Sequence, residues 1–310
     1  MGKVCTNAAR LRNRSVAAAL LAIGAFGMHP AHAKETPAQT AAVAVGAQYD
    51  TTHVYVASAD FDAFVSSFAA TFDGKPGAVL VTNVLPVASR ARFQAVTTSA
   101  GSLSAFAYET PIPYPFGQER TGYLVTDMDA ALQAARAAGA EVVVAKFRDP
   151  IGLDAVIQWP GGVKMQLYWH FTAPSYAPLA TIPDNRVYVS PDAVSAFVDG
   201  FLRFSHGRIR ADDKHADARE VGRPGETYRR IDIESKFGRL RVLATDGHLP
   251  YPYGHEVTGF EVQDLAATLA KATAADAKLL VPALDSGGRR SAMVEFPGGF
   301  IAELHALKAH

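Results

Sequence analysis

The sequence predicts an α+β fold made of two homologous halves, each built from two β-α-β-β-β units. The first observation behind this prediction is an internal repeat, since His53-Val-Tyr-Val56 returns as Arg186-Val-Tyr-Val189, 133 residues later. Trp159-Pro-Gly-Gly162 returns as Phe296-Pro-Gly-Gly299, 137 residues later. The second observation is the alternation of apolar and polar residues beside these motifs, which is typical of half-buried strands that alternate with amphipathic helices.

A third repeated segment, residues 113–123, returns as residues 250–260, and both copies begin with Pro-Tyr-Pro. The offset between the copies grows from 133 to 137, so we expect four extra residues in the second half, within the charged stretch 206–220. The predicted boundaries, in chain order, are a signal peptide (1–33), a flexible lead-in (34–49), a first domain (50–172), a Pro-rich linker (173–183) and a second domain (184–310).

Each unit is expected to consist of a strand, a helix and three further strands. In the second unit, an alternating strand after residue 119 precedes a helix that begins at Asp129 and ends at Gly139, because glycine favours a helix C-terminus. Pro160-Gly-Gly162 predicts a tight turn between the last two strands. The remaining predicted strands of this unit are 141–146, 154–159 and 163–169, and the fourth unit repeats the order with a helix at 265–276 and strands at 279–282, 291–296 and 300–305.

The N-terminus has the features of an export signal. Basic residues precede the apolar run 16–26, and Ala31-His32-Ala33 matches the small-residue pattern of a cleavage site. We therefore expect cleavage after Ala33 and a periplasmic or secreted protein without a membrane segment after cleavage. The single cysteine, Cys5, lies within the signal, which excludes disulfides and cysteine-based sites from the mature chain.

The composition and the motifs exclude several function classes. Of 310 residues, 49% are hydrophobic and 19% are charged, which is typical of a globular protein. The 30 basic and 30 acidic residues balance, and removal of the basic signal leaves a slightly acidic chain, so no nucleic-acid partner is expected. No P-loop, dinucleotide-binding glycine pattern or Ser-His-Asp order indicates an NTPase, a dehydrogenase or a hydrolase.

Residues 121–132 (Thr-Gly-Tyr-Leu-Val-Thr-Asp-Met-Asp-Ala-Ala-Leu), 139–144 and 159–167, with their echoes in the second half, resemble the vicinal oxygen chelate superfamily. This family includes glyoxalase I, bleomycin-resistance proteins and extradiol dioxygenases. The resemblance implies two tandem glyoxalase-like domains, in which consecutive units pair into a sheet curled as a cup. It also implies a small-molecule ligand and a divalent metal of unknown identity, although the fold alone hosts many chemistries. A monomer or a homodimer is expected, and the sequence does not distinguish the two.

The family's metal ligands lie on the first and last strands of each unit, so strand alternation gives the residues that face each cup. The expected ligand positions are His53, Ala105, Arg120 and Gln166 in the first half, and Arg186, Val242, Val257 and Glu303 in the second. Neither set supplies the three or four imidazole or carboxylate groups that first-row metals need. This departure from the family pattern leaves alternative interpretations open.

In one interpretation the first cup holds a polar or anionic organic ligand, because a guanidinium beside a lone histidine repels a metal cation. The predicted substrate-binding residues are Arg120, Lys164, Gln166, Tyr168 and Tyr55. In the other, the first and fourth units share a cup, and His53, Glu303 and His305 form a two-histidine, one-carboxylate metal site.

The leading functional hypothesis is an exported glyoxalase-like enzyme that acts on a small oxygenated metabolite with metal assistance, as a lyase, an isomerase or a dioxygenase. Glu303 would then act as the catalytic proton shuttle. The competing hypothesis is a metal-free periplasmic protein that binds or sequesters a small molecule, and the sequence itself requires no cofactor. A third hypothesis makes one half a purely structural partner.

Overall fold

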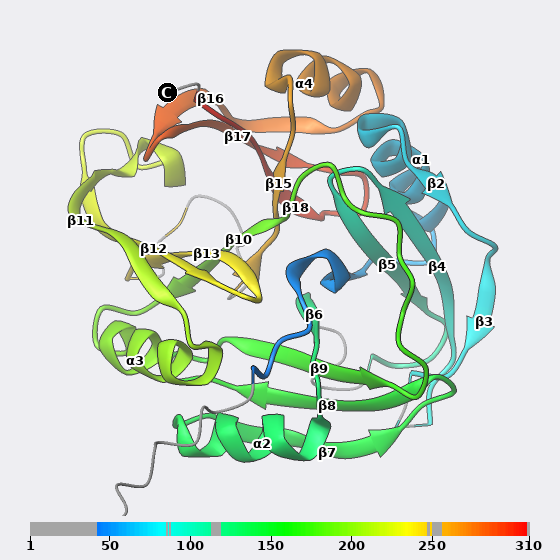
Figure 1. The fold of residues 1–310 in the computed structure, drawn as a ribbon. Helices are drawn as coiled ribbons and strands as arrows, with labels where there is room; N and C mark the ends of the chain where they lie inside the picture. The colour runs from blue at the N-terminus through cyan, green and yellow to red at the C-terminus, as the bar shows by residue number, and fades with distance from the viewer. Residues whose placement is uncertain are drawn as a thin grey trace, which may run out of the picture. The chain divides into compact units, whose positions relative to one another are not determined.

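The computed structural model describes residues 42–84, 86, 88–112, 119–246, 249 and 256–308, and Figure 1 shows their arrangement. The predicted signal peptide, the first part of the lead-in and most of both Pro-Tyr-Pro segments lie outside these residues. Residues 42–49, expected to be a flexible lead-in, instead belong to the folded first half. Val43 and Ala44 are buried, Ala44 forms an isolated bridge with Val125, and Ala47–Tyr49 is a short 3-10 helix, η1.

The first half contains both predicted β-α-β-β-β units. The elements of its first unit are β1 (Thr51–Tyr55), α1 (Phe61–Phe72), β2 (Lys75–Pro76), β3 (Leu80–Thr82), β4 (Ala91–Thr98) and β5 (Gly101–Tyr108). Those of its second unit are β6 (Arg120–Leu124), α2 (Met128–Ala137), β7 (Glu141–Arg148), β8 (Gly152–Gln158) and β9 (Lys164–His170).

The second half repeats this order with one addition, a 3-10 helix after its second strand. The elements of the third unit are β10 (Asp184–Val189), α3 (Val194–Ser205), β11 (Arg208–Asp217), η2 (Ala218–Val221), β12 (Thr227–Ser235) and β13 (Gly238–Ala244). Those of the fourth unit are β14 (Glu256–Val257), β15 (Gly259–Glu261), α4 (Leu265–Ala274), β16 (Lys278–Ser286), β17 (Arg289–Glu295) and β18 (Ile301–Leu307).

Local sequence signals account for the ends of these elements. Helix α2 begins after Asp127, whose side chain accepts a hydrogen bond of 2.7 Å from the Ala130 amide and so satisfies one of the unpaired N–H groups of the first turn. The turns between the last two strands of the second and fourth units need a left-handed backbone, which glycine adopts without steric cost. Their φ angles are 87° and 86° at Gly161 and Gly162, and 85° and 88° at Gly298 and Gly299.

Consecutive units pair, as the family resemblance implied. In the first half β1 pairs with β6 in antiparallel fashion, with His53 opposite Arg120, and one nine-stranded sheet results. In Figure 1 this sheet runs from β4 and β5 through β6 to β9 and β8. In the second half β10 pairs with β14 in the same way, with Arg186 opposite Val257. The predicted α+β class is therefore confirmed. No described strand of the first unit pairs with one of the fourth, so the alternative in which these two units share a cup is wrong.

The outer faces of the sheets carry the helices, and each helix also packs against the other half. Rings of α1 meet rings of the fourth unit, with Phe68 and Phe72 at centroid distances of 5.4 and 4.9 Å from Phe260. On the other side Trp159 meets Phe201 of α3 at 6.2 Å. The apolar cores lie between these outer faces and the helices. The inner face of each sheet is therefore not covered by the helices, and either a ligand or other side chains of the protein can contact it.

Candidate functional site

The inner face of the first sheet borders a cleft of about 1030 Å³. Strands β1, β4, β5, β6 and β9 supply most of its walls, and residues 149–151, 153–154 and 175–179 also line it. Four of the five residues predicted to bind a substrate line it, namely Tyr55, Arg120, Gln166 and Tyr168. The structure thus brings together side chains that are more than 100 positions apart in the sequence.

One wall of the cleft is aromatic. Tyr55 stacks on Phe106 with ring centroids 5.3 Å apart and planes 18° apart, and Phe93 lies 5.1 Å from Phe106 on the neighbouring strand. The edge of the His53 ring meets Phe106 at 5.8 Å. Aromatic rings on adjacent strands offer a flat, apolar surface to which another flat ring can stack.

The adjoining wall, formed by β6, β9 and β8, is polar and is held by a chain of three side chains. Arg120 donates from Nε to Gln166 Oε1 at 3.0 Å, and Gln166 donates from Nε2 to Asp154 Oδ1 at 3.1 Å. The guanidinium of Arg120 also lies 5.5 Å from the centre of the Tyr55 ring. Arg120 is 2% exposed, so its position is fixed by packing as well as by these contacts.

His53 lies on β1 beside Arg120 and is 8% exposed. Burial, reinforced by the positive charge of Arg120, lowers the pKa of His53 to about 3, so the imidazole is neutral near pH 7. Its Nδ1 atom makes no hydrogen bond within the described part of the chain. A buried polar atom without a partner is costly, and a ligand that hydrogen-bonds to it would remove that cost.

Asp154 is the titratable group of the polar wall. Burial raises its pKa to about 7, with a further contribution from the nearby negative charge of Asp149, against the opposing hydrogen bond from Gln166. Asp154 therefore changes its charge in the neutral range. Sequence reasoning missed this residue, and the available signal was a lone aspartate within the apolar strand 154–159.

Gly122 allows these groups to approach one another. A Cβ atom at this position would lie 3.1 Å from His53 Cε1 and 3.4 Å from Tyr168 Cε1. Tyr168 in turn donates its hydroxyl proton to the Tyr49 carbonyl in η1, which connects the lead-in to the cleft.

Lys164, also predicted to bind substrate, is buried on β9 and is not among the residues that line the cleft.

Two of the expected ligand positions are wrong by one residue. His53 is opposite Ser104, and Arg186 is opposite Arg241, so Ser104 and Arg241 face the cups. Ala105 and Val242 point to the other side of their strands and are buried in the cores beneath the helices. Successive side chains alternate between the faces of a sheet, so an error of one residue in register reverses the face.

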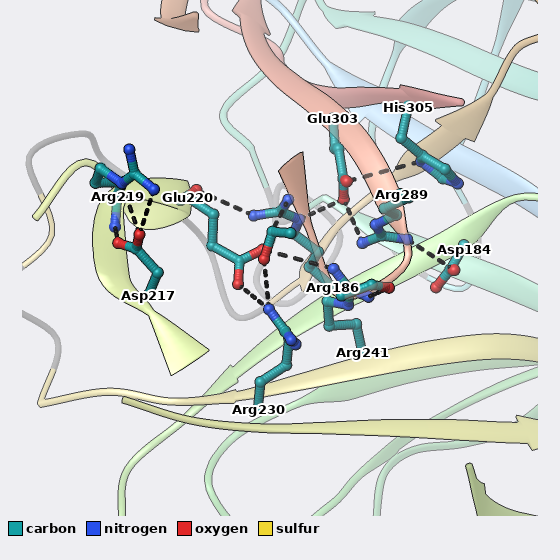
Figure 2. A network of polar contacts seen from close by, with 12 residues as sticks. Asp184, Arg186, Asp217, Arg219, Glu220, Arg230, Arg241, Arg289, Glu303 and His305 are labelled. Atoms are coloured by element: carbon teal, nitrogen blue, oxygen red, sulfur yellow. Dashed lines mark hydrogen bonds and ion pairs between the residues drawn. The ribbon is translucent and has the colours of Figure 1, made fainter. Parts of the chain in front are cut away.

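Glu303 and His305 do not meet His53. They lie on β18 of the second half, where both are fully buried in a network of charged side chains (Figure 2). Glu303 accepts hydrogen bonds from Arg186 Nε and, at 2.8 Å, from Arg289 Nη2, and it lies 3.7 Å from His305 Nδ1. The guanidinium groups hold the pKa of Glu303 well below its usual range despite burial.

The expectation that Glu303 shuttles protons is therefore corrected. A carboxylate fixed between two guanidinium groups has little tendency to take up a proton near neutral pH, and it lies outside the cleft. The expected metal set of His53, Glu303 and His305 is corrected as well, because these side chains face different cups.

The donors of the cleft do not fit a divalent metal. Among the described residues no three His, Cys, Asp or Glu side chains are grouped to hold one. His53 is the one imidazole at the family's ligand positions, and the Gln166 oxygen is already engaged by the Arg120 cation. A first-row metal needs several anionic or imidazole donors without a cation between them.

Solved structures with similar folds include a triple mutant of 4-hydroxymandelate synthase from Streptomyces coelicolor, at 12% identity and a TM-score of 0.58 over 84% of this chain and 92% of that chain. A Mn(II)-bound glyoxalase from Novosphingobium aromaticivorans matches at 12% identity and a TM-score of 0.53 over 86% and 83% of the two chains. 2,2',3-Trihydroxybiphenyl 1,2-dioxygenase from Sphingomonas wittichii matches at 12% identity and a TM-score of 0.54, over 86% of this chain and 90% of that chain.

These proteins share the vicinal oxygen chelate fold, and the present chain has that fold. No family model and no curated protein matches the sequence. Within the described part of the chain, no helix combines the length and the apolar character needed to cross a membrane.

Proposed function

We propose that this chain, with its vicinal oxygen chelate fold, binds a small planar molecule that carries an anionic oxygen, and that binding requires no metal. The observation that carries the proposal is the cleft of about 1030 Å³, which places aromatic rings beside the Arg120–Gln166 pair. Its size is in the range of pockets that enclose small organic ligands.

The two walls favour the two ends of such a molecule. A flat ring would stack beside Phe106 and Phe93 and bury apolar area, while a carboxylate or phenolate oxygen would lie near the Arg120 guanidinium. Neutral His53 adds a hydrogen-bonding atom that does not repel an anion. Ser104, opposite His53, presents a hydroxyl to the same cleft.

Metal-assisted lyase, isomerase or dioxygenase chemistry was the leading hypothesis from the sequence. It would need a donor set that the cleft residues do not form, since Arg120 occupies one of the family's ligand positions. The binding hypothesis uses Arg120 directly, because a buried guanidinium is well suited to a carboxylate. The arrangement of the cleft therefore favours binding over metal-assisted catalysis.

Benzoate is a suitable probe because it combines a flat ring with one carboxylate. We expect calorimetry to show benzoate binding to the purified chain more tightly than acetate, which lacks the ring, and than benzyl alcohol, which lacks the charge. Arg120→Gln should lower benzoate affinity by about ten-fold or more, the usual effect of losing a hydrogen bond to a charged group. Addition of EDTA or Mn²⁺ should change the affinity less than about two-fold.

Arg208→Gln is the matched control, because Arg208 is an exposed arginine of the second half that pairs with Glu234. It should bind benzoate as the unmodified chain does. Equal affinity for benzoate and benzyl alcohol, or unchanged benzoate affinity in a folded Arg120→Gln variant, would contradict the proposal. A requirement for added Mn²⁺ would restore the metal-assisted hypothesis.

We also propose export, with the ligand met outside the cytoplasm. Support comes from the basic and apolar pattern of residues 1–33 and the small residues at 31–33. The N-terminal residue of protein recovered from the periplasm or the medium should be Lys34, as N-terminal sequencing would show. An intact N-terminus in that protein would contradict the proposal.

A further inference from the structure

The second half differs from the first in what fills its cup. The second half has a five-stranded sheet, β11-β12-β13-β10-β14, and a four-stranded one, β15-β18-β17-β16. Ala218 and Val221 of η2 are buried against residues on the inner face of the five-stranded sheet, including Tyr188, Leu243 and Val257. These are the positions that, in the first half, surround the cleft. The segment η2, which connects β11 to β12, therefore fills part of the second cup and overlaps the stretch 206–220 in which the sequence predicted extra residues.

Glu220 is the residue of η2 that reaches the charged part of the cup, and it is 1% exposed. It accepts a hydrogen bond of 2.6 Å from Arg230 Nη1 and another from the Tyr228 hydroxyl. Its second oxygen lies 3.5 Å from Arg241 Nη1 and 3.7 Å from Arg186 Nη2. Three guanidinium groups from β10, β12 and β13 thus surround one carboxylate, as Figure 2 shows for Glu220 and its neighbours.

The position of this carboxylate corresponds to the cleft of the first half. Arg186 lies on β10 at the position that His53 has on β1. His53 is opposite Ser104 of β5 and Arg120 of β6, and Arg186 is opposite Arg241 of β13 and Val257 of β14. A side-chain carboxylate therefore lies in the second cup at the place that the open cleft occupies in the first.

The fit between Glu220 and the arginines is incomplete. Glu220 Oε2 and Arg241 Nη1 are both buried, face one another at 3.5 Å and make no hydrogen bond within the described part of the chain. A carboxylate tethered to η2 cannot move closer, whereas a free one is able to rotate and form both bonds. A cavity of about 420 Å³, bordered by Ala218, Val221, Tyr228 and Leu243, lies beside η2, and none of the three arginines lines it.

We propose that the second cup is a binding site for a small carboxylate, and that Glu220 occupies it as a built-in ligand. The site consists of Arg186, Arg230 and Arg241 with the Tyr228 hydroxyl. It is separate from the cleft of the first half and does not depend on the function proposed for that cleft. In the unmodified chain η2 closes the site, so free carboxylates have no access to the three arginines.

Chemical rescue tests this proposal. Glu220→Gly removes the carboxylate and leaves room for a small anion, so its melting temperature should fall in sodium chloride. Sodium formate at equal ionic strength should raise that melting temperature by about 5 °C, because an anion that binds the folded state alone stabilises it by mass action. The unmodified chain should show no such difference between the two salts.

Two further variants give the test its controls. Glu220→Gln keeps the volume of the side chain without its charge, so formate should not rescue it. Glu234→Gly removes an exposed carboxylate that pairs with Arg208 and Arg210, and formate should not rescue it either. Equal effects of formate on all four proteins, or no effect on Glu220→Gly, would overturn the proposal.

If Glu220→Gly is recovered only unfolded, refolding from urea replaces melting as the measurement. A higher yield of folded protein in formate than in chloride, seen for this variant and not for Glu220→Gln, would support the built-in ligand. Equal yields in the two salts would overturn it.

Discussion

Burial determines the charge of the individual residues in the cleft. His53 and Asp154 both lie in its walls, and the loss of water around each side chain disfavours its charged form. Burial lowers the pKa of the histidine to about 3 and raises that of the aspartate to about 7. The histidine is therefore a neutral hydrogen-bonding group at physiological pH, and the aspartate is the group whose charge changes there.

A pH dependence of ligand binding follows from Asp154. It is protonated below pH 7 and ionised above, and its carboxylate is linked to Arg120 through Gln166. Ionisation adds a negative charge near the anion, so benzoate affinity should fall between pH 6 and pH 8. Calorimetry at the two pH values should show a clear decrease for the unmodified chain and little change for Asp154→Asn. A decrease of equal size in both proteins would contradict this assignment.

At the scale of elements, the phase of a strand determines which residues reach the cleft. In β5 the buried residues alternate with half-buried ones, and Leu103, Ala105 and Ala107 belong to the core beneath α1. Ser104 and Phe106 consequently face the cleft. The small side chain of Ala105 matches its place in a tightly packed core, where there is no room for a larger one.

Two leucine substitutions at neighbouring positions test the phase of β5. Ala105→Leu inserts three carbon atoms into the core and should lower the free energy of unfolding by about 1–3 kcal/mol, as overpacking usually does. Ser104→Leu projects into the cleft, so it should leave stability nearly unchanged and reduce benzoate binding instead. Urea unfolding and calorimetry on both variants give the comparison. The reverse pattern would mean that β5 has the opposite phase.

At the scale of the whole described molecule, the two halves meet through buried polar groups as well as through their helices. Glu256 of the second half accepts a hydrogen bond from the Thr121 amide of the first half at 3.1 Å. Asn185 donates to the same carboxylate at 2.9 Å and to Thr121 Oγ1 at 2.8 Å. Asp50 is buried nearby, and burial together with the charge of Glu256 raises its pKa well above the usual value.

Asp50 should therefore reduce stability at neutral pH. In the unfolded chain the Asp50 carboxyl ionises near pH 4, whereas in the folded chain its pKa is raised. The free energy of unfolding therefore falls as the pH rises through about 4, and it levels off once the folded carboxyl also ionises. Asp50→Asn should be more stable than the unmodified chain at pH 7, and the difference should disappear below pH 4. Urea unfolding at both pH values measures it.

The control for this experiment is Asp62→Asn, because Asp62 is an exposed carboxylate at the start of α1. Its effect should stay within about 0.5 kcal/mol, as is usual for surface substitutions. An Asp50→Asn variant that is less stable than the unmodified chain at pH 7 would show that the carboxylate has a stabilising partner.

The repeat and the strand alternation were sufficient to predict the fold class and the four units, and four of the five residues predicted to bind a substrate line the cleft. These two patterns determine local structure, because the apolar period and the turn glycines act over a few residues. The one-residue error at Ala105 arose where both faces of β5 carry small or apolar side chains, so that alternation does not identify the inner face. At Val242 the apolar face of β13 is the one expected to be inner, whereas the structure turns the charged residue Arg241 toward the cup.

Only the tertiary structure showed which cup is open. The sequence gives nearly equal halves, yet Arg120, Gln166 and Asp154 surround a cleft in one, while Glu220 and its arginines fill the other. Such contacts join residues from strands far apart in the chain, and the ionisation of Asp154 and Glu303 depends on water excluded by the assembled sheets. The sequence alone determined the repeated pattern of elements; long-range packing determined where a ligand has room and which charges are already paired.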